Sequence, residues 1–156
     1  MTAYHIAQIN IARMLAPIDS DTMSGFVARI DEINALADTA DGFIWRLQGE
    51  EGNATALRVF ADDMLIINMS VWESIDALHA YTYKSDHAQV FRRRKDWFSL
   101  MEKPHMALWY IPAGHIPTPD EAKHKLALIE KQGASPSAFT FVKRFELQDW
   151  LAIQGN

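Results

Sequence analysis

The chain has 156 residues, 49% of them hydrophobic and 22% charged, which predicts a single globular domain over residues 1–156. Its formal net charge of −5 argues against a general nucleic-acid-binding protein, because such proteins neutralise phosphates with an excess of lysine and arginine. The lack of cysteine excludes disulfides, thiolate metal ligands and thiol nucleophiles, and the lack of any apolar run of about 18 residues predicts no membrane span and a cytoplasmic protein.

The N-terminal part of the chain predicts a strand followed by a helix. Residues 4–11 show the two-residue alternation of a strand, which places Gln8 and Asn10 on the same face. Apolar residues then recur at helical spacing over residues 23–37, and this pattern predicts an amphipathic helix.

Two further strands are predicted at residues 43–48 and 64–72. Residues 64–72 are apolar at nearly every position, which is typical of a strand covered on both faces. Residues 54–63 fit either an extension of this hairpin or a loop with some strand. The two strands are predicted to pair in antiparallel fashion, with a long connection between them.

A pair of helices is predicted next, at residues 73–83 and 86–101. On the second helix, His87 and Arg94 fall at the centre of an apolar stripe when each residue turns the helix by about 100°. The stripe consists of Val90, Phe91, Trp97, Phe98 and Met101. An arginine that faces a core needs an anionic or hydrogen-bonding partner, because an unpaired buried charge is very costly. That partner is another side chain, a second subunit or a ligand.

The C-terminal third predicts a strand at residues 106–111 and a helix between Thr118 and Gly133. Thr118 lies just before acidic residues that favour the start of a helix, and Gly133 is typical of a helix end. A short extra strand is predicted at residues 139–145, whereas residues 146–156 contain apolar residues but no clear anchor.

The predicted order is β-α-β-β-α-β followed by an added helix and strand, which is the ferredoxin-like plan of the α+β class. This plan gives a four-stranded antiparallel sheet with its two helices on one face. We therefore expect the other face to be bare and to be covered by a second copy of the chain, which predicts a homodimer.

Several segments of the chain are distinctive enough to compare with known families. They are Ala7-Gln8-Ile9-Asn10, Gly42-Phe43-Ile44-Trp45-Arg46-Leu47, Asn68-Met69-Ser70-Val71-Trp72-Glu73-Ser74, Arg92-Arg93-Arg94 with Trp97-Phe98, and Leu108-Trp109 with Pro112-Ala113-Gly114-His115-Ile116-Pro117-Thr118. With these segments the chain resembles the DUF3291 family, within the dimeric α/β-barrel superfamily that includes the antibiotic-biosynthesis-monooxygenase-like proteins. The resemblance runs from about residue 4 to residue 141. It implies a dimeric α/β barrel and assigns no catalytic residues.

A barrel interior needs some polar lining to fix a ligand, and Gln8, Asn10 and Asn68 are its first candidates. Gln8 and Asn10 either donate hydrogen bonds into the cavity or bond to a neighbouring loop. Asn68 is unusual in a central strand, so it either lines the cavity or bonds across the sheet.

Three side chains are candidates for charge-based chemistry. Arg46 holds a carboxylate or an enolate if it faces the cavity, and it is a solvated charge if it faces the rim. His87 is a general base or an axial metal ligand, or else a histidine bonded to backbone near a helix start. Arg94 is an anion clamp or a member of a structural ion pair.

Trp72 and Trp109 are candidates for the walls of a pocket for a flat molecule, although packing in an aromatic core explains them equally well. The six histidines are scattered without the HExxH spacing of a zinc site, and the seven glycines form no phosphate-binding loop. We therefore expect neither a metal nor a cofactor.

Three functions are compatible with this sequence. The first is a cofactor-independent, monooxygenase-like enzyme that acts on a flat hydrophobic substrate in the barrel cavity. His87 or Asn10 would help to form a substrate carbanion that reacts with oxygen, and Arg46 or Asn68 would stabilise the resulting anion. The second is a non-catalytic protein that holds a hydrophobic ligand. The third is haem binding through His87 or His79.

Overall fold

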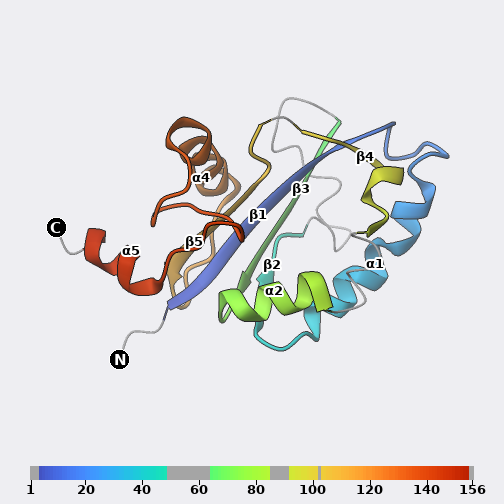
Figure 1. The fold of residues 1–156 in the computed structure, drawn as a ribbon. Coiled ribbons are helices and arrows are strands. Elements are labelled where there is room, and N and C mark those ends of the chain that lie inside the picture. The colour runs from blue at the N-terminus through green and yellow to red at the C-terminus, as the bar shows by residue number, and fades with distance from the viewer. Residues whose placement is uncertain (1–3, 49–63, 85–91, 102, 155–156) are drawn as a thin grey trace.

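The computed structural model describes residues 4–48, 64–84, 92–101 and 103–154. Figure 1 shows an antiparallel sheet with helices arranged around it. The elements in chain order are β1 (Tyr4–Met14), α1 (Ser24–Asp38), β2 (Phe43–Arg46), β3 (Leu65–Trp72), α2 (Ile75–Lys84), the 3₁₀ turn η1 (Arg94–Asp96), β4 (Phe98–Ser99), β5 (Met106–Pro112), α4 (Pro119–Gln132) and α5 (Leu147–Gln154). Their order confirms the ferredoxin-like α+β fold.

The sheet is organised around its longest strand, β1. One edge of β1 pairs with β3, which pairs in turn with β2, and the other edge pairs with β5 and then with β4 near the end of the strand. Every pairing is antiparallel, so the side chains of directly opposed residues point to the same face. The register of β1 against β3 places Gln8 opposite Ser70 and Asn10 opposite Asn68.

One face of the sheet packs against α1 and α2, and we call it the α1–α2 face. Near the start of β1, Ile6, Trp72 and Leu108 form a buried cluster with Leu78 of α2 and with Phe139. At the other end of β1, Met14 packs with Met23 and Trp97, and apolar residues of α1 join this second cluster. The α1–α2 face therefore has two apolar clusters with the middle of the sheet between them.

The opposite face of the sheet packs against α4 (Figure 1). Leu126 and Ile129 of α4 lie in one buried cluster with Ile9 of β1 and Trp109 of β5. The prediction that this face is bare is therefore wrong where α4 lies. The sequence indicated the added helix correctly, but its helical pattern does not say which face of the sheet it covers.

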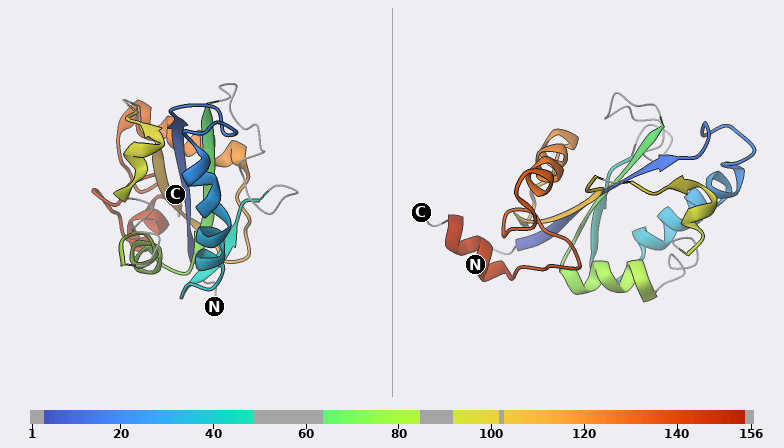
Figure 2. Two further views of the ribbon diagram at one scale, coloured as in Figure 1. Left: turned by 90° about the vertical axis from the view of Figure 1, so that its right-hand side faces the viewer. Right: turned by 45° about the horizontal axis from the view of Figure 1, so that its top comes forward.

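The chain after α4 returns to the α1–α2 face around the outer edge of β5. Phe139 exchanges two backbone hydrogen bonds with Leu108, at 2.7 and 2.9 Å, which protects part of that edge from pairing with another strand. The predicted strand at residues 139–145 is thus reduced to an isolated bridge. The tail also has an anchor, because Trp150 of α5 packs edge-on against Tyr4 at 5.5 Å. Figure 2 shows α5 beside the start of β1.

The predicted helix at residues 86–101 is wrong in its second half. Residues 85–91 lie outside the described residues, Arg94–Asp96 forms a single 3₁₀ turn, and Phe98–Ser99 is the short strand β4. Phe98 is opposite Met14 of β1, and its ring meets Phe26 of α1 edge-on at 4.9 Å. Strand pairing and aromatic packing therefore outweigh the local helical pattern here.

No helix in the described part of the chain is both long and apolar enough to cross a membrane. The ambiguous residues 54–63 lie outside the described ranges, so their predicted alternatives stay open.

Candidate functional site

Four polar side chains form a row in the middle of the α1–α2 face. Gln8 and Asn10 come from β1, and Ser70 and Asn68 lie directly opposite them on β3. We call these four residues the polar strip. Gln8 and Ser70 are each only 6% exposed, whereas Asn10 and Asn68 are exposed. The predicted placement of Gln8, Asn10 and Asn68 on shared strand faces is confirmed by this register.

The buried half of the polar strip is held by three hydrogen bonds. The indole Nε1 of Trp72 donates to Ser70 Oγ at 2.8 Å, and Gln8 Nε2 donates to the same oxygen at 2.8 Å. Gln8 Nε2 also donates to Asn68 Oδ1 at 2.6 Å. These bonds offset the cost of placing amide and hydroxyl groups in a sheet core. The bond from Gln8 also fixes the position of Asn68 at the exposed end of the strip.

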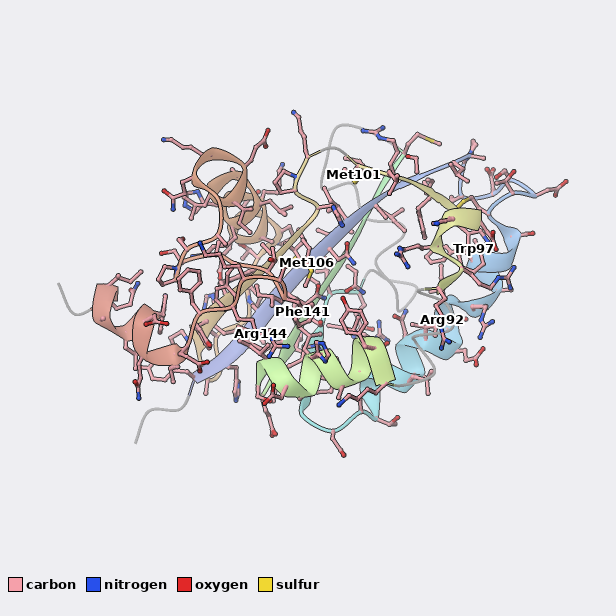
Figure 3. All side chains as sticks on the ribbon, viewed as in Figure 1. Arg92, Trp97, Met101, Met106, Phe141 and Arg144 are labelled. Atoms are coloured by element: carbon pink, nitrogen blue, oxygen red, sulfur yellow. The ribbon has the colours of Figure 1, made fainter. Side chains whose placement is uncertain are left out.

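Apolar and aromatic side chains flank the polar strip. The Trp72 ring packs against Phe43 at 5.4 Å and against Tyr81 of α2 at 5.0 Å, which makes an aromatic wall at one end. Met106, labelled in Figure 3, lies opposite Asn10 on β5. The strip is therefore a line of hydrogen-bonding groups between two apolar clusters, and small-molecule sites likewise combine apolar walls with a few polar groups.

Arg46 lies opposite Ser70 on β2, one strand away from the polar strip. Its Nε and Nη2 donate to the two carboxylate oxygens of Asp38 at 2.7 and 3.3 Å, and its side chain is 13% exposed. Nearby, Tyr81 donates its hydroxyl hydrogen to the carbonyl of Ile33 at 3.0 Å. Burial first and the Asp38 carboxylate second raise the pKa of Tyr81, while Arg46 lowers it. Arg46 thus belongs to an ion pair at the end of α1.

The other predicted charged candidates are not brought to the polar strip. His87 lies outside the described residues. Arg94 is exposed on η1, so the prediction that it faces a core is wrong, because the helix that would have turned it inward ends early. Its neighbour Arg93 stacks over Trp97 at 5.1 Å and pairs with Asp96 at 3.1 Å.

Trp109 lies on the opposite face of the sheet, where α4 packs, so it does not form a wall of the polar strip. Its Nε1 donates to Glu121 Oε2 at 2.8 Å, and the other carboxylate oxygen of Glu121 bonds to His115 Nε2 at 2.7 Å. This network joins β5, the following loop and the first turn of α4. The sequence predicted Glu121 only as an acidic residue in the first turn of this helix, and its bonds to Trp109 and His115 were not predicted.

His79, the alternative haem ligand, is packed among aromatic rings. Its ring centroid lies 4.7 Å from that of Tyr83 and 5.3 Å from that of Phe141. Among the residues that the structure describes, no group of three or more histidine, aspartate or glutamate side chains is placed to hold a metal ion.

Two hollows are lined by described residues, and the polar strip lies in neither of them. One of about 450 Å³ lies between α2 and the turn before β2, and one of about 300 Å³ lies between the start of β1 and the C-terminal segment. The chemistry of the strip comes from its amide and hydroxyl groups.

Three solved structures have a similar course of chain at low sequence identity. A protein of unknown function, NE2512 from Nitrosomonas europaea, is 10% identical with a TM-score of 0.46, covering 74% of this chain and 96% of its own. PA3566 from Pseudomonas aeruginosa is 12% identical with a TM-score of 0.45, covering 75% and 99%. A protein from Nitrosomonas europaea with a provisional name as an antibiotic biosynthesis monooxygenase is 11% identical with a TM-score of 0.43, covering 74% and 93%.

No curated protein sequence matches the chain. The sequence profile of DUF3291, described as a domain of unknown function, matches residues 5–154. This match covers almost the whole chain and agrees with the segments from which the resemblance was inferred. The chain belongs to the DUF3291 family.

Proposed function

We propose that the polar strip binds a small, flat organic molecule that carries at least one polar group. The observation that supports this proposal is the bonded row of Gln8, Asn68 and Ser70 between two apolar clusters of the same sheet face. A polar row within a core is costly, and apolar side chains would fill the same sheet positions more cheaply. Hydrogen bonding of a ligand to the exposed end of the row would account for polar residues at these positions.

The two halves of the polar strip have different parts in this proposal. Trp72, Ser70 and Gln8 form a buried base whose hydrogen bonds fix the geometry before a ligand arrives. Asn10 and Asn68 are exposed and offer amide groups to the ligand. A site that is organised in advance loses less conformational entropy on binding than one that must be ordered by the ligand.

The binding proposal is tested by removing the exposed amides. Calorimetric titration with flat bicyclic compounds would compare the wild-type chain with Asn10→Leu and Asn68→Leu, which keep the branched shape of the side chain and remove its hydrogen bonding. Gln148→Leu is the matched control, because Gln148 is an exposed amide on α5. We expect both strip variants to lose roughly 5-fold or more in affinity, as the loss of one hydrogen bond predicts. Equal affinity for all four proteins would refute the proposal.

Oxygenation of the bound molecule is the second candidate function. It is favoured by the position of Arg46, which lies on the strand next to Ser70, so a guanidinium and the strip amides lie on one sheet face. Such donors stabilise the oxyanion of an enolate or phenolate, the species whose carbanion form reacts with oxygen. The strip amides have no basic nitrogen near neutral pH, so Asn10 would position the substrate, and His87 would be the base that removes its proton.

Oxygen consumption separates the two functions. A panel of phenols, quinols and anthrones would be supplied to the wild-type chain in an oxygen electrode, with His87→Gln as the comparison. Consumption above background that disappears in His87→Gln would support the enzyme. Background consumption with compounds that bind would refute oxygenation and leave the binding proposal in place.

A homodimer formed through the sheet also belongs to this proposal. The part of the sheet near β2 is the area available for it, because α4 already packs over β5 and β1 on that face. Sedimentation velocity at micromolar concentration tests the pairing directly. A single monomeric species would refute it.

A further inference from the structure

The hydrogen bonds of the polar strip run in one direction along the strip. Ser70 Oγ receives one hydrogen from the Trp72 indole and one from Gln8 Nε2. An indole nitrogen can only donate, so Ser70 must be an acceptor in this pair. Gln8 Nε2 then gives its second hydrogen to Asn68 Oδ1.

The consequence appears at Asn68, the exposed end of this chain of bonds. A side-chain amide has one carbonyl oxygen and an NH₂ group with two donor hydrogens. The Asn68 oxygen is turned toward Gln8 and already accepts one hydrogen bond from it, so the NH₂ group is the part of the amide that is turned away from Gln8. Because Asn68 is exposed, this NH₂ group is accessible to a ligand.

The charged side chain of the neighbouring strand is already paired. Arg46 lies opposite Ser70, and its Nε and Nη2 donate to the two carboxylate oxygens of Asp38. The preference of the strip for one kind of ligand group therefore rests on the orientation of the Asn68 amide.

We propose that the polar strip is selective for ligands that present a hydrogen-bond-accepting oxygen, such as the carbonyl of an aryl ketone or the oxyanion of its enolate. This inference rests on the proposed binding function and names the chemical class of its ligand. Asn68 Nδ2 donates to the ligand oxygen, the buried bonds of Gln8 and Ser70 keep Asn68 in that orientation, and the ring of the ligand lies on the apolar side chains beside the strip.

Three probes of nearly the same shape test this selectivity. Indanone carries only an acceptor, indole carries only a donor, and indane carries no hydrogen-bonding group. Titration calorimetry on the wild-type chain is expected to give an affinity for indanone roughly 5-fold higher than for either of the others, the ratio that one net hydrogen bond provides. This comparison needs no variant and is independent of any effect of substitution on folding.

The substitution Asn68→Asp reverses the exposed end of the strip with little change in shape. The new carboxylate still accepts the hydrogen of Gln8 Nε2, but it presents oxygen where the NH₂ group was. The preference for indanone over indole is expected to disappear or to invert. Gln148→Glu makes the same chemical change on exposed α5 and is expected to keep the wild-type preference, and circular dichroism verifies the fold of both variants.

The possible outcomes separate the inference from the function on which it rests. Indanone preference in the wild type, lost in Asn68→Asp and kept in Gln148→Glu, supports it. Equal or tighter binding of indole, or an unchanged preference in Asn68→Asp, overturns the selectivity while ligand binding stands. No binding of any of the three probes overturns both.

Discussion

The buried bond between Ser70 and the Trp72 indole gives the sharpest test of the site's architecture. In Ser70→Ala the indole N–H stays buried, since Trp72 is 1% exposed, and loses its acceptor. An unsatisfied buried donor costs about 1–3 kcal/mol. Gln8 keeps its bond to Asn68, so it adds little to this cost.

A double-mutant cycle isolates this contribution from packing. Trp72→Phe removes the indole N–H, and Ser70 Oγ then still accepts from Gln8. In the Trp72→Phe background, Ser70→Ala no longer leaves a buried indole donor unsatisfied. We therefore expect Ser70→Ala to cost less there than in the wild type, with a coupling energy of about 1–2 kcal/mol.

Urea denaturation followed by far-ultraviolet circular dichroism measures this coupling, because the signal does not depend on the altered tryptophan. For a chain of this length, a coupling energy of about 1–2 kcal/mol corresponds to a difference in Tm of about 2–8 °C. Ser20→Ala is a suitable control, since its exposed hydroxyl only bonds within a turn, and should change stability by less than about 0.5 kcal/mol. A coupling energy near zero would refute the role given to Ser70.

Three further predictions concern the frame around the site. Gly42→Ala should cost about 2–4 kcal/mol in the same urea denaturation, because Gly42 has a φ of 81° and an added Cβ would lie 2.6 Å from the Cβ of an alanine in α2. Gly133→Ala should cost only about 1–2 kcal/mol, because Gly133 has a φ of 77° but open space around it. Glu121→Gln should cost about 1 kcal/mol by weakening the bond from the Trp109 indole, and an unchanged denaturation midpoint would contradict this. Burial first and two neighbouring carboxylates second raise the pKa of Tyr110 from 10.0 to about 12. The contribution of the protonated Tyr110 hydroxyl to folding stability is therefore complete below pH 10 and is lost as the pH rises toward 12. Tyr110→Phe should flatten the pH dependence of the unfolding free energy in that window.

Most elements of the fold were predictable because their signals are local. The alternation in β1 and β3 and the helical spacing in α1 and α4 are properties of short segments, and they predicted these elements to within a few residues. The predicted helix at residues 86–101 failed in its second half because Phe98 pairs with Met14, which is distant in sequence. A local pattern carries no information about such a partner.

The sequence predicted which side chains of the candidate site share a strand face, but it did not predict their hydrogen-bond partners. Two-residue periodicity placed Gln8 and Asn10 together, but the strand register decides that Gln8 lies opposite Ser70. The partner of Arg46 depends on how the end of α1 sits over β2, and this places Asp38 within 2.7 Å. Periodicity says which way a side chain points, whereas hydrogen-bond partners follow from packing between elements.

The position of the polar strip separates ligand binding from subunit pairing. Two of the three hydrogen bonds of the strip join β1 to β3 and the third lies within β3, all in one chain, and the strip lies on the face that α1 and α2 cover. Pairing with a second copy was inferred for the opposite face, where α4 now occupies part of the area. A second copy on that face would contact the far side of the sheet and would add no side chain to the strip. If pairing uses that face, the selectivity proposed for the strip depends on a single chain, and we expect the same preference for an acceptor oxygen in a monomer and in a dimer.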